Sequence, residues 1–315
     1  MGITKKLDGL LLIDKPLGLT SHDVVARVRR VAGQKEVGHT GTLDPLATGL
    51  LVVCLGKATK ISQFLSEADK EYEATIRLGV RSTTFDAEGV DETGVSANAP
   101  ELLDSAFCSV LNGFLGEQDQ QVPPYASVRL NGRHMYDLAR EGETMERPVR
   151  RITISSLDVL TYQKPDLTIR VKCTKGTYIR ALANDIGERL GCGGYLAQLR
   201  RTSAGRFHIQ HAVTLEQLES LQTREELESR VLPIADALEF SSISLAQGRS
   251  EIVSHGRIPL WQDVQEISGL FRSGDKVLLK DAQGGALAVG IAGADSRGAH
   301  NPSGTPIESY VRVLV

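Results

Sequence analysis

Cysteine is scarce in this chain, and its spacing argues against a metal site. Only four cysteines occur among 315 residues, at positions 54, 108, 173 and 192, and no two of them form a Cys-x-x-Cys pair. Structural zinc sites are usually built on such close pairs, so no metal site is expected. Cys54 and Cys173 stand in apolar, strand-like runs and are expected to be buried free thiols, which favours a reducing cytoplasm.

Long apolar runs are also absent. No stretch approaches the ~20 consecutive apolar residues that a membrane-spanning helix needs. The first residues, 1–6, lead straight into Leu10–Ile13, without the longer apolar core and small-residue cleavage site of a signal peptide. We therefore expect a cytosolic protein that does not associate with a membrane.

The chain lacks an excess of positive charge, since its formal net charge is −3. Any nucleic-acid contact must therefore come from local patches. Basic residues gather in two segments, the first made of Arg170, Lys172, Lys175, Arg180, Arg189, Arg200, Arg201 and Arg206, and the second of Arg129, Arg133, Arg140, Arg147, Arg150 and Arg151. These segments are compatible with one RNA-binding face, and equally with a scatter of solvated charges.

The length and the 41% hydrophobic content fit a globular protein with one large and one smaller domain. Alternating apolar residues predict strands at 9–13, 50–55, 71–79 and 166–175. Apolar residues at helical spacing predict helices at 21–31, 177–190 and, opened by Pro100, 100–113.

The remaining segments differ in composition. Residues 82–98 are polar and are predicted to be a loop, and the acidic residues 212–240 are predicted to be a solvated linking helix. After about residue 243, short strand runs are separated by glycine-rich turns, which predicts a small β-rich domain. The predicted domains are residues 1–242 and residues 243–315 of an α+β protein.

The run from Gly38 to Leu51 is the most informative part of the sequence. It places three glycines and three threonines around one carboxylate, Asp44, which is followed by Pro45. Such a composition suits a loop whose backbone lies close to a ligand. An acid in that position can act as a nucleophile or a general base. The plainer alternative is a turn-forming Asp beside Gly and Pro.

This run resembles the catalytic segment of the TruB family of tRNA pseudouridine synthases over all fourteen positions. Three further segments resemble family motifs: Lys70-Glu71-Tyr72, the string from Lys175 to Arg180, and the string from Gly193 to Gly205. Lys15-Pro16 matches a family element near the pocket. The resemblance is strong over residues 8–205 and weak over 205–240.

The resemblance implies a pseudouridine synthase catalytic fold with a mixed, mostly antiparallel central sheet, plus a small C-terminal β-barrel of the PUA type. The implied reaction is isomerisation of uridine 55 in the T loop of tRNA, by flipping the base and without metal or organic cofactor. The implied partner is the T stem-loop of tRNA. A monomer with no obligatory protein partner is the default.

The resemblance also implies roles for single residues. Asp44 is the catalytic nucleophile, and the sequence leaves open whether it attacks C6 of the base or assists departure at C1′. Tyr72 stacks on the flipped base, although an ordinary inward-facing strand tyrosine is the simpler reading. Arg180 pairs with the Asp44 carboxylate and orients it.

Other residues are assigned to the pocket by the same resemblance. Tyr178 and Leu199 shape it, His39 occupies the space vacated by the flipped base or contacts its neighbour, and Lys15 lies close by. Arg200 and Arg201 are expected to meet phosphates. For each of these residues, a core or turn role without function is the alternative.

One segment departs from the family, because Tyr125 is followed by Ala-Ser-Val-Arg instead of Ser-Ala, an aliphatic residue and Lys. This puts local support and RNA contacts in doubt. Three other functions remain open: a non-catalytic RNA-binding or RNA-folding protein, a glycoside hydrolase, and a synthase working inside a guide-RNA complex. The hydrolase is disfavoured because such enzymes pair two carboxylates, and no second acid stands in the pocket motifs.

Overall fold

A ten-stranded sheet forms the body of the molecule. The computed structural model describes residues 6–95, 98–101, 104–126, 128–130, 132–135, 146–296 and 304–315. The main strand order is β14-β1-β3-β12-β4-β11-β10-β7, with β2 paired to β3 and β13 to β12. Its strands are β1 (Gly9–Lys15), β2 (Val37–His39), β3 (Ala47–Leu55), β4 (Lys70–Leu78), β7 (Gly116–Gln121), β10 (Val149–Gln163), β11 (Asp166–Cys173), β12 (Gly194–Ala204), β13 (Phe207–His208) and β14 (Val213–Thr214).

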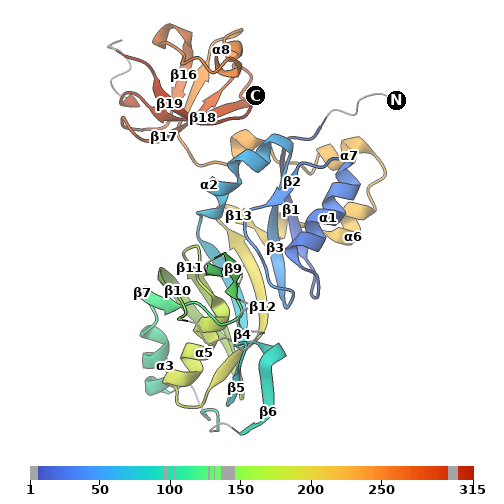
Figure 1. Ribbon diagram of the computed structural model, residues 1–315, viewed down its shortest axis with the longest axis vertical. Coiled ribbons are helices and arrows are strands. Elements are labelled where there is room, and N and C mark those ends of the chain that lie inside the picture. The colour runs from blue at the N-terminus through green and yellow to red at the C-terminus, as the bar shows by residue number, and fades with distance from the viewer. Residues whose placement is uncertain are drawn as a thin grey trace.

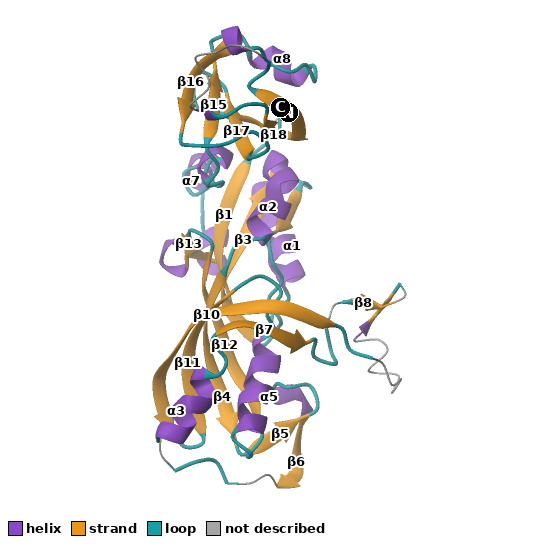
Figure 2. Ribbon diagram, turned by 90° about the vertical axis from the view of Figure 1, so that its left-hand side faces the viewer, coloured by secondary structure: helices purple, strands orange, loops and turns teal. Residues whose placement is uncertain are grey.

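The sheet is mixed and mostly antiparallel, as predicted. Among the described strands of this sheet, only the pairings β1–β14 and β12–β3 are parallel. Helices α3 (Ser105–Asn112) and α5 (Ile179–Arg189) pack together at one end of the sheet, and α1 (Ser21–Ala32) lies beside β1 and β3 (Figures 1 and 2). The α+β prediction is therefore confirmed.

Helix α1 follows its predicted pattern closely. Val24 and Val28 are fully buried on its inner face. Thr20 caps its first turn, since its side chain accepts from the Asp23 N–H while the Asp23 side chain accepts from the Thr20 N–H. Gly33 ends the helix in the left-handed conformation, with φ of 63°.

Strand β4 carries the alternation that the sequence showed. Tyr72, Ala74, Ile76 and Leu78 all face inward and are at most 9% exposed. β4 pairs with β11 on one side and with β12 on the other, so it lies in the interior of the sheet. The predicted strand at 71–79, with Tyr72 on its inner face, is therefore confirmed.

Three predicted boundaries were wrong. Residues 82–98 are not all loop, because β5 (Val80–Ser82) and β6 (Val90–Val95) pair as a hairpin around a short 3-10 turn, η2 (Ala87–Gly89). Helix α3 begins after Asp104, whose side chain caps it, and not at Pro100; Leu102 and Leu103 lie outside the described residues. Helix α5 begins at Ile179 instead of Thr177, with Tyr178 at the N-cap.

The acidic segment 212–240 is not one solvated helix. It forms two short helices, α6 (Leu215–Glu219) and α7 (Arg224–Glu228), followed by the 3-10 turn η4 (Ile234–Asp236). Capping boxes open both helices, and a polar cap competes with a continuous helix. Leu215, Leu218 and Leu227 are buried in one cluster with residues of α1 and β1, so the segment is part of the core.

A second sheet of five strands begins at Ser242. Its order is β16-β15-β17-β18-β19, and it forms the upper end of the elongated molecule, with helix α8 (Ser250–Ser254) beside it (Figure 1). The strands are β15 (Ser242–Leu245), β16 (Val264–Ser268), β17 (Lys276–Lys280), β18 (Ala286–Ala292) and β19 (Ile307–Val313), and the 3-10 turn η5 (Trp261–Asp263) precedes β16.

The two sheets share a hydrophobic cluster. Leu278, Val289 and Leu314 of the C-terminal part are buried together with Ile61 and Phe207 of the large sheet's region. Ile61 ends the 3-10 helix η1 (Gly56–Ile61), which runs into helix α2 (Ser62–Ser66). None of the helices in the described part of the chain is both long and apolar enough to span a membrane.

Candidate active site

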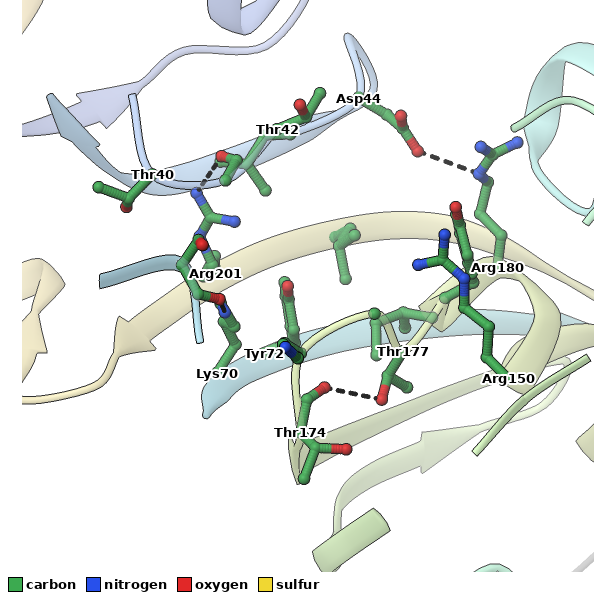
Figure 3. A pocket seen from close by; sticks show the side chains of 18 of the residues that line it. Thr40, Thr42, Asp44, Lys70, Tyr72, Arg150, Thr174, Thr177, Arg180 and Arg201 are labelled. Carbon is green, nitrogen blue, oxygen red and sulfur yellow. Dashed lines mark hydrogen bonds and ion pairs between the residues drawn. The ribbon is translucent and has the colours of Figure 1, made fainter. Parts of the chain in front are cut away.

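A cavity of about 390 Å³ opens beside the loop that joins β2 to β3 (Figure 3). Its walls come from residues 40–44, strands β4 and β12, and the turn between β11 and α5. The predicted site residues in its lining are Asp44, Tyr72, Tyr178, Arg180 and Leu199. A cavity of this size is typical of a small-ligand site, and its lining combines apolar side chains with many polar and charged ones.

The Asp44 carboxylate faces a buried arginine across the cavity. Nε of Arg180 lies 3.0 Å from Oδ2 of Asp44, which is the predicted pairing. The Arg180 side chain is only 8% exposed, whereas that of Asp44 is 40% exposed. The guanidinium therefore fixes one carboxylate oxygen from the protein side and leaves the group accessible from the cavity.

A second acid, Asp86, was missed in the sequence. Its Oδ2 lies 3.3 Å from Nη1 of Arg180, and its side chain is 5% exposed. Arg180 also donates to the backbone carbonyls of Thr84 and Tyr125, at 3.3 and 3.0 Å. Asp86 follows Phe85, which has a positive φ of 66°, so a strained backbone helps aim the acid. No motif marked this residue, because it lies in the segment predicted to be a loop.

The loop that carries Asp44 is fastened to the start of α1. The Ser21 hydroxyl accepts from the Leu43 N–H at 2.8 Å and donates to the Leu43 carbonyl at 3.1 Å. The Gly18 N–H donates to the Pro45 carbonyl at 2.9 Å. Both neighbours of Asp44 are thus tied to the turn that begins with Lys15-Pro16, which gives that predicted element a structural role.

Lys15 itself is fully buried and does not line the cavity. Its ammonium group donates to the carbonyls of Leu19 and Pro16, at 2.6 and 3.0 Å. Burial lowers the pKa of Lys15, and the negative charge of Asp44 opposes that shift. Lys15 therefore stabilises the turn below Asp44 and acts on the site through its charge.

Tyr72 and Leu199 form the apolar floor of the cavity. Both are 9% exposed and come from neighbouring strands, β4 and β12. Burial raises the pKa of the Tyr72 phenol, so the phenol is neutral near pH 7 and keeps its proton. A neutral aromatic face at the floor is suited to stacking on a flat, uncharged ring.

Arg201, which the sequence predicted to meet phosphates, is buried in the lining of the cavity. Arg201 is 3% exposed, and its guanidinium donates to the carbonyls of Leu50 (2.7 Å) and Gly41 (3.1 Å). It lies directly across from Tyr72 on the neighbouring strand. Arg201 therefore ties the loop before Asp44 to the cavity floor (Figure 3).

Tyr178 stands at the N-cap of α5, at the junction where the sequence placed it. Its backbone is held by Gln120 of β7, whose amide donates to the Tyr178 carbonyl (3.0 Å) and accepts from its N–H (2.8 Å). The ring lines the cavity, and the guanidinium of Arg150 lies 5.7 Å above it. Tyr178 is thus placed to form a wall of the pocket.

His39 lies outside the cavity lining, on strand β2. Its Nδ1 atom is buried and has no hydrogen-bond partner among the described residues. Burial, and secondly the charge of Arg201, lower the pKa of the imidazole. It is therefore neutral near pH 7.

Several predicted phosphate-binding cations are paired with acids instead. Arg200 makes a bidentate pair with Asp14, at 2.7 and 3.1 Å, and Arg170 pairs with Glu73 at 2.8 Å. Lys175 is hydrogen-bonded to Glu67. The acids come from distant parts of the chain, on β1, on β4 and at the end of α2, which explains why the basic segments looked uncompensated along the sequence. Arg140 lies outside the described residues.

In the described part of the chain, no group of three or more His, Cys, Asp or Glu side chains is arranged to hold a metal ion. The cavity lining includes Asp44, Tyr72, Arg180 and Arg201. Lys70 also lines the cavity. Burial, and secondly the charge of Arg201, lower the pKa of its ammonium group to about 8.

Comparison with protein families places this site in context. Residues 29–179 match the model of the TruB family pseudouridylate synthase N-terminal domain, and residues 180–239 match the tRNA pseudouridylate synthase B C-terminal domain. This chain belongs to the TruB family. It is therefore a pseudouridine synthase, and the cavity around Asp44 is the candidate active site of that family's enzyme.

Relatives with the name tRNA pseudouridine synthase B are similar over most of the chain. The protein of Burkholderia mallei is 50% identical over 236 residues, which cover 74% of this chain and 76% of the relative. That of Opitutus terrae is 45% identical and covers 74% and 95%. That of Ralstonia pickettii is 46% identical and covers 81% of both. The family resemblance read from the motifs is confirmed.

Solved structures confirm the predicted catalytic fold. A chain of the Cbf5-Nop10-Gar1 complex superposes with a TM-score of 0.74 at 26% identity, over 98% of this chain and 85% of that one. A chain of the archaeal box H/ACA Nop10-Cbf5 complex gives 0.72 at 26% identity and covers 98% and 86%. The α+β architecture is therefore that of TruB-type pseudouridine synthases.

Proposed function

We propose that this TruB-family enzyme isomerises uridine 55 in the T loop of tRNA, with Asp44 as the nucleophile and without metal or organic cofactor. The observation that carries the proposal is the Asp44 carboxylate, held by Arg180 at 3.0 Å and open to a cavity floored by Tyr72. The tRNA substrate rests on the 45–50% identity to enzymes named tRNA pseudouridine synthase B.

The cavity has the size and lining for a flipped base. Taking a uridine out of a folded RNA loop costs a few kcal/mol. Stacking of a base on an aromatic side chain returns ~1–3 kcal/mol. Tyr72 supplies the platform, and Leu199 and Tyr178 complete the walls. The proposed pocket thus offers an apolar platform for the ring, with Asp44 and several basic side chains around it.

The reaction breaks the N1–C1′ bond of uridine, forms a C5–C1′ bond, releases the proton of C5 and adds a proton to N1. No electrons are lost or gained in total, so no oxidant is needed. Asp44 acts either by attack at C6 of the ring or by stabilising C1′ as the base departs; both use the carboxylate face that Arg180 leaves open. Tyr72 keeps its proton near pH 7, because burial raises its pKa.

The supporting residues act through position. Asp86 holds the far side of the Arg180 guanidinium, at 3.3 Å. Lys15 and Ser21 hold the turn and the loop on either side of Asp44. His39, on the strand that leads into this loop, supports the RNA loop after the base has left it. Preorganisation of this kind lowers the barrier, because the groups need not rearrange during the reaction.

We also propose a two-domain, monomeric, cytoplasmic enzyme. Residues 1–242 form the catalytic domain, and residues 243–315 form a PUA-like domain that contacts RNA outside the T loop. The support is the change of sheet at Ser242. The two sheets share buried residues, so the second domain is held at a fixed distance from the cavity.

A synthase working inside a guide-RNA complex is the second candidate, because two of the similar solved structures are named as H/ACA complexes. The identity to those chains is 25–26%, against 45–50% to the tRNA pseudouridine synthase B relatives. The higher identity favours an enzyme that works on tRNA by itself.

The test is tritium release from tRNA transcripts labelled at uridine C5. The full-length enzyme should release one equivalent per tRNA, and Asp44→Asn should release none while still binding tRNA. A transcript with cytidine at position 55 should release no tritium beyond the background of its other uridines. Release that persists in Asp44→Asn would overturn the nucleophile, and release only with an added guide RNA would favour the second candidate.

A further inference from the structure

Arg150 is a cation at the cavity that the proposed reaction does not use. It stands on β10, is exposed, and lines the cavity together with Asp44 and Tyr178 (Figure 3). Its guanidinium lies 5.7 Å from the centre of the Tyr178 ring, a cation–π distance that limits the freedom of the long side chain. The arginine is thus held in place at the site.

The neighbouring turn leaves room for Arg150. Gly176 has a φ of 79°, a conformation that favours glycine. A Cβ on this residue would come within 3.2 Å of Nη1 of Arg150. A bulkier residue at 176 would therefore displace the guanidinium or strain the turn, so the two positions are matched to each other.

Arg150 differs from nearby cations in its pairing with acids. Lys175, also in the lining, is neutralised by Glu67. Arg151, the next residue along β10, pairs with Glu117 at 2.6 Å and with Asp119 at 3.1 Å. Among the described residues no carboxylate pairs with Arg150, so its charge is available to a ligand.

The position of Arg150 at the mouth of the cavity indicates which part of a bound nucleotide it contacts. The floor residues Tyr72 and Leu199 are 9% exposed, whereas Arg150, Lys175 and Gly176 are exposed at the mouth. A nucleotide that inserts its base against Tyr72 leaves its sugar-phosphate backbone at the mouth. Planar guanidinium groups bind phosphate oxygens in pairs, and an exposed phosphate is the anion nearest to such a base.

We propose that the Arg150 guanidinium binds one of the two phosphates that flank the target uridine and holds the flipped nucleotide at the mouth of the cavity. This inference rests on the proposed function, because it takes an RNA uridine as the substrate. Arg150 acts as a positioning residue: it contacts the backbone of the substrate and takes no part in bond breaking.

The chain offers a matched control for this proposal. Arg150→Met removes the charge but keeps an unbranched side chain over Tyr178, and Arg151→Met removes the same charge from the adjacent position, whose side chain lies on the opposite face of the strand. Binding of a T-arm stem-loop RNA is measured with the full-length chain in the Asp44→Asn background, so that no turnover occurs. Arg150→Met should weaken binding roughly 10-fold, and Arg151→Met less than about twofold.

Two further readouts separate a direct contact from a general loss of charge. The slope of log affinity against log salt should fall by about 0.7 in Arg150→Met, the value for one phosphate contact on a single strand. Each flanking phosphate is replaced in turn by a neutral methylphosphonate. At the contacted phosphate, this change should weaken binding to the chain that keeps Arg150, and it should not weaken binding to Arg150→Met any further. The proposal would be overturned if Arg150→Met and Arg151→Met weakened RNA binding equally. It would also be overturned if the loss of affinity in Arg150→Met simply added to the loss caused by each of the two neutral linkages.

Tritium release by the wild-type enzyme from unmodified RNA is measured in parallel. If tritium is released but the effects of Arg150→Met and of either neutral linkage on binding are independent, the phosphate contact is overturned and the proposed function stands. Absence of release overturns the proposed function, whatever the binding cycle shows. Release together with coupling at one linkage supports both and identifies the phosphate.

Discussion

At the scale of single residues, the Asp44 carboxylate is held by its surroundings more than by its own loop. Arg180 fixes one oxygen, Ser21 ties Leu43, and Arg201 holds Gly41 from below. Misplacement of reacting groups by about 1 Å can cost ~100-fold in rate. Residues that touch no substrate are therefore expected to matter for catalysis.

Arg201 provides the sharpest test of this idea. In Arg201→Lys, an ammonium group replaces the guanidinium that donates to the carbonyls of both Leu50 and Gly41. A lysine cannot reproduce both hydrogen bonds. The single-turnover rate of tritium release should fall roughly 10- to 100-fold, with little change in RNA affinity. Arg200→Lys, which alters the exposed neighbour, is the control and should stay within about twofold. A loss of RNA affinity that accounts for the whole rate effect would restore the phosphate contact first predicted for Arg201.

His39 predicts a pH dependence of stability. Its pKa in the folded protein lies below the unfolded value of about 6.5, because it is buried. Below that pH the unfolded chain takes up the proton first, so the contribution of His39 to the free energy of unfolding falls with acidification. Urea unfolding at about pH 7.5 and about pH 5.5 should show a larger loss for the wild type than for His39→Gln. Equal losses would show that the imidazole titrates normally.

At the scale of elements, helix α5 brings Arg180 to the site by packing closely on β12. A Cβ at Gly187 would lie 2.2 Å from the backbone of Gly193 and Gly194. Only a glycine allows the helix to approach the start of β12 at this distance, and the approach fixes the position of the helix that carries Arg180.

Gly187→Ala should therefore destabilise the fold by roughly 1–3 kcal/mol through overpacking and lower the rate of tritium release. Gly38→Ala is a suitable control for stability, because its Cβ would meet only a methyl group of Thr59, at 3.9 Å. Urea midpoints of the two variants provide the comparison. A Gly187→Ala midpoint equal to that of Gly38→Ala would mean that α5 can shift without cost.

At the scale of the whole molecule, the two sheets are joined through a common cluster. Phe64 of α2 packs edge-on against Phe240 at 5.7 Å, and the ammonium of Lys276 from the second sheet lies 5.5 Å from the Phe64 ring. Leu278, Val289 and Leu314 bury their side chains in the same cluster. The C-terminal part is therefore a packed extension of the catalytic part.

A chain truncated after residue 241 should lose stability and expose the cluster. We expect a lower urea midpoint and binding of a hydrophobic dye, because large apolar patches do not remain on soluble surfaces. Replacing Phe64 by Ser in the truncated chain should reduce dye binding, since that ring lies at the junction. A truncated chain with an unchanged midpoint would show that the second sheet is an independent module.

The sequence by itself determined the elements with one clear periodicity, and the motif residues. α1, β4 and β11 follow from alternating or helical burial, and the cavity residues Asp44, Tyr72 and Arg180 follow from the family resemblance. These features are local in the chain: a cap, a glycine stop or a buried face is encoded within a few residues.

Only the tertiary structure decided which charges are paired and where they lie. Arg201 is buried below the cavity, and Asp86 joins Arg180 from a hairpin 94 residues away. No acid in the described part of the chain pairs with Arg150, while Arg151 is paired, although the two are adjacent in sequence. Such outcomes depend on strand pairing between distant segments and on which face of a strand meets the core, and neither is encoded in the spacing of the residues concerned.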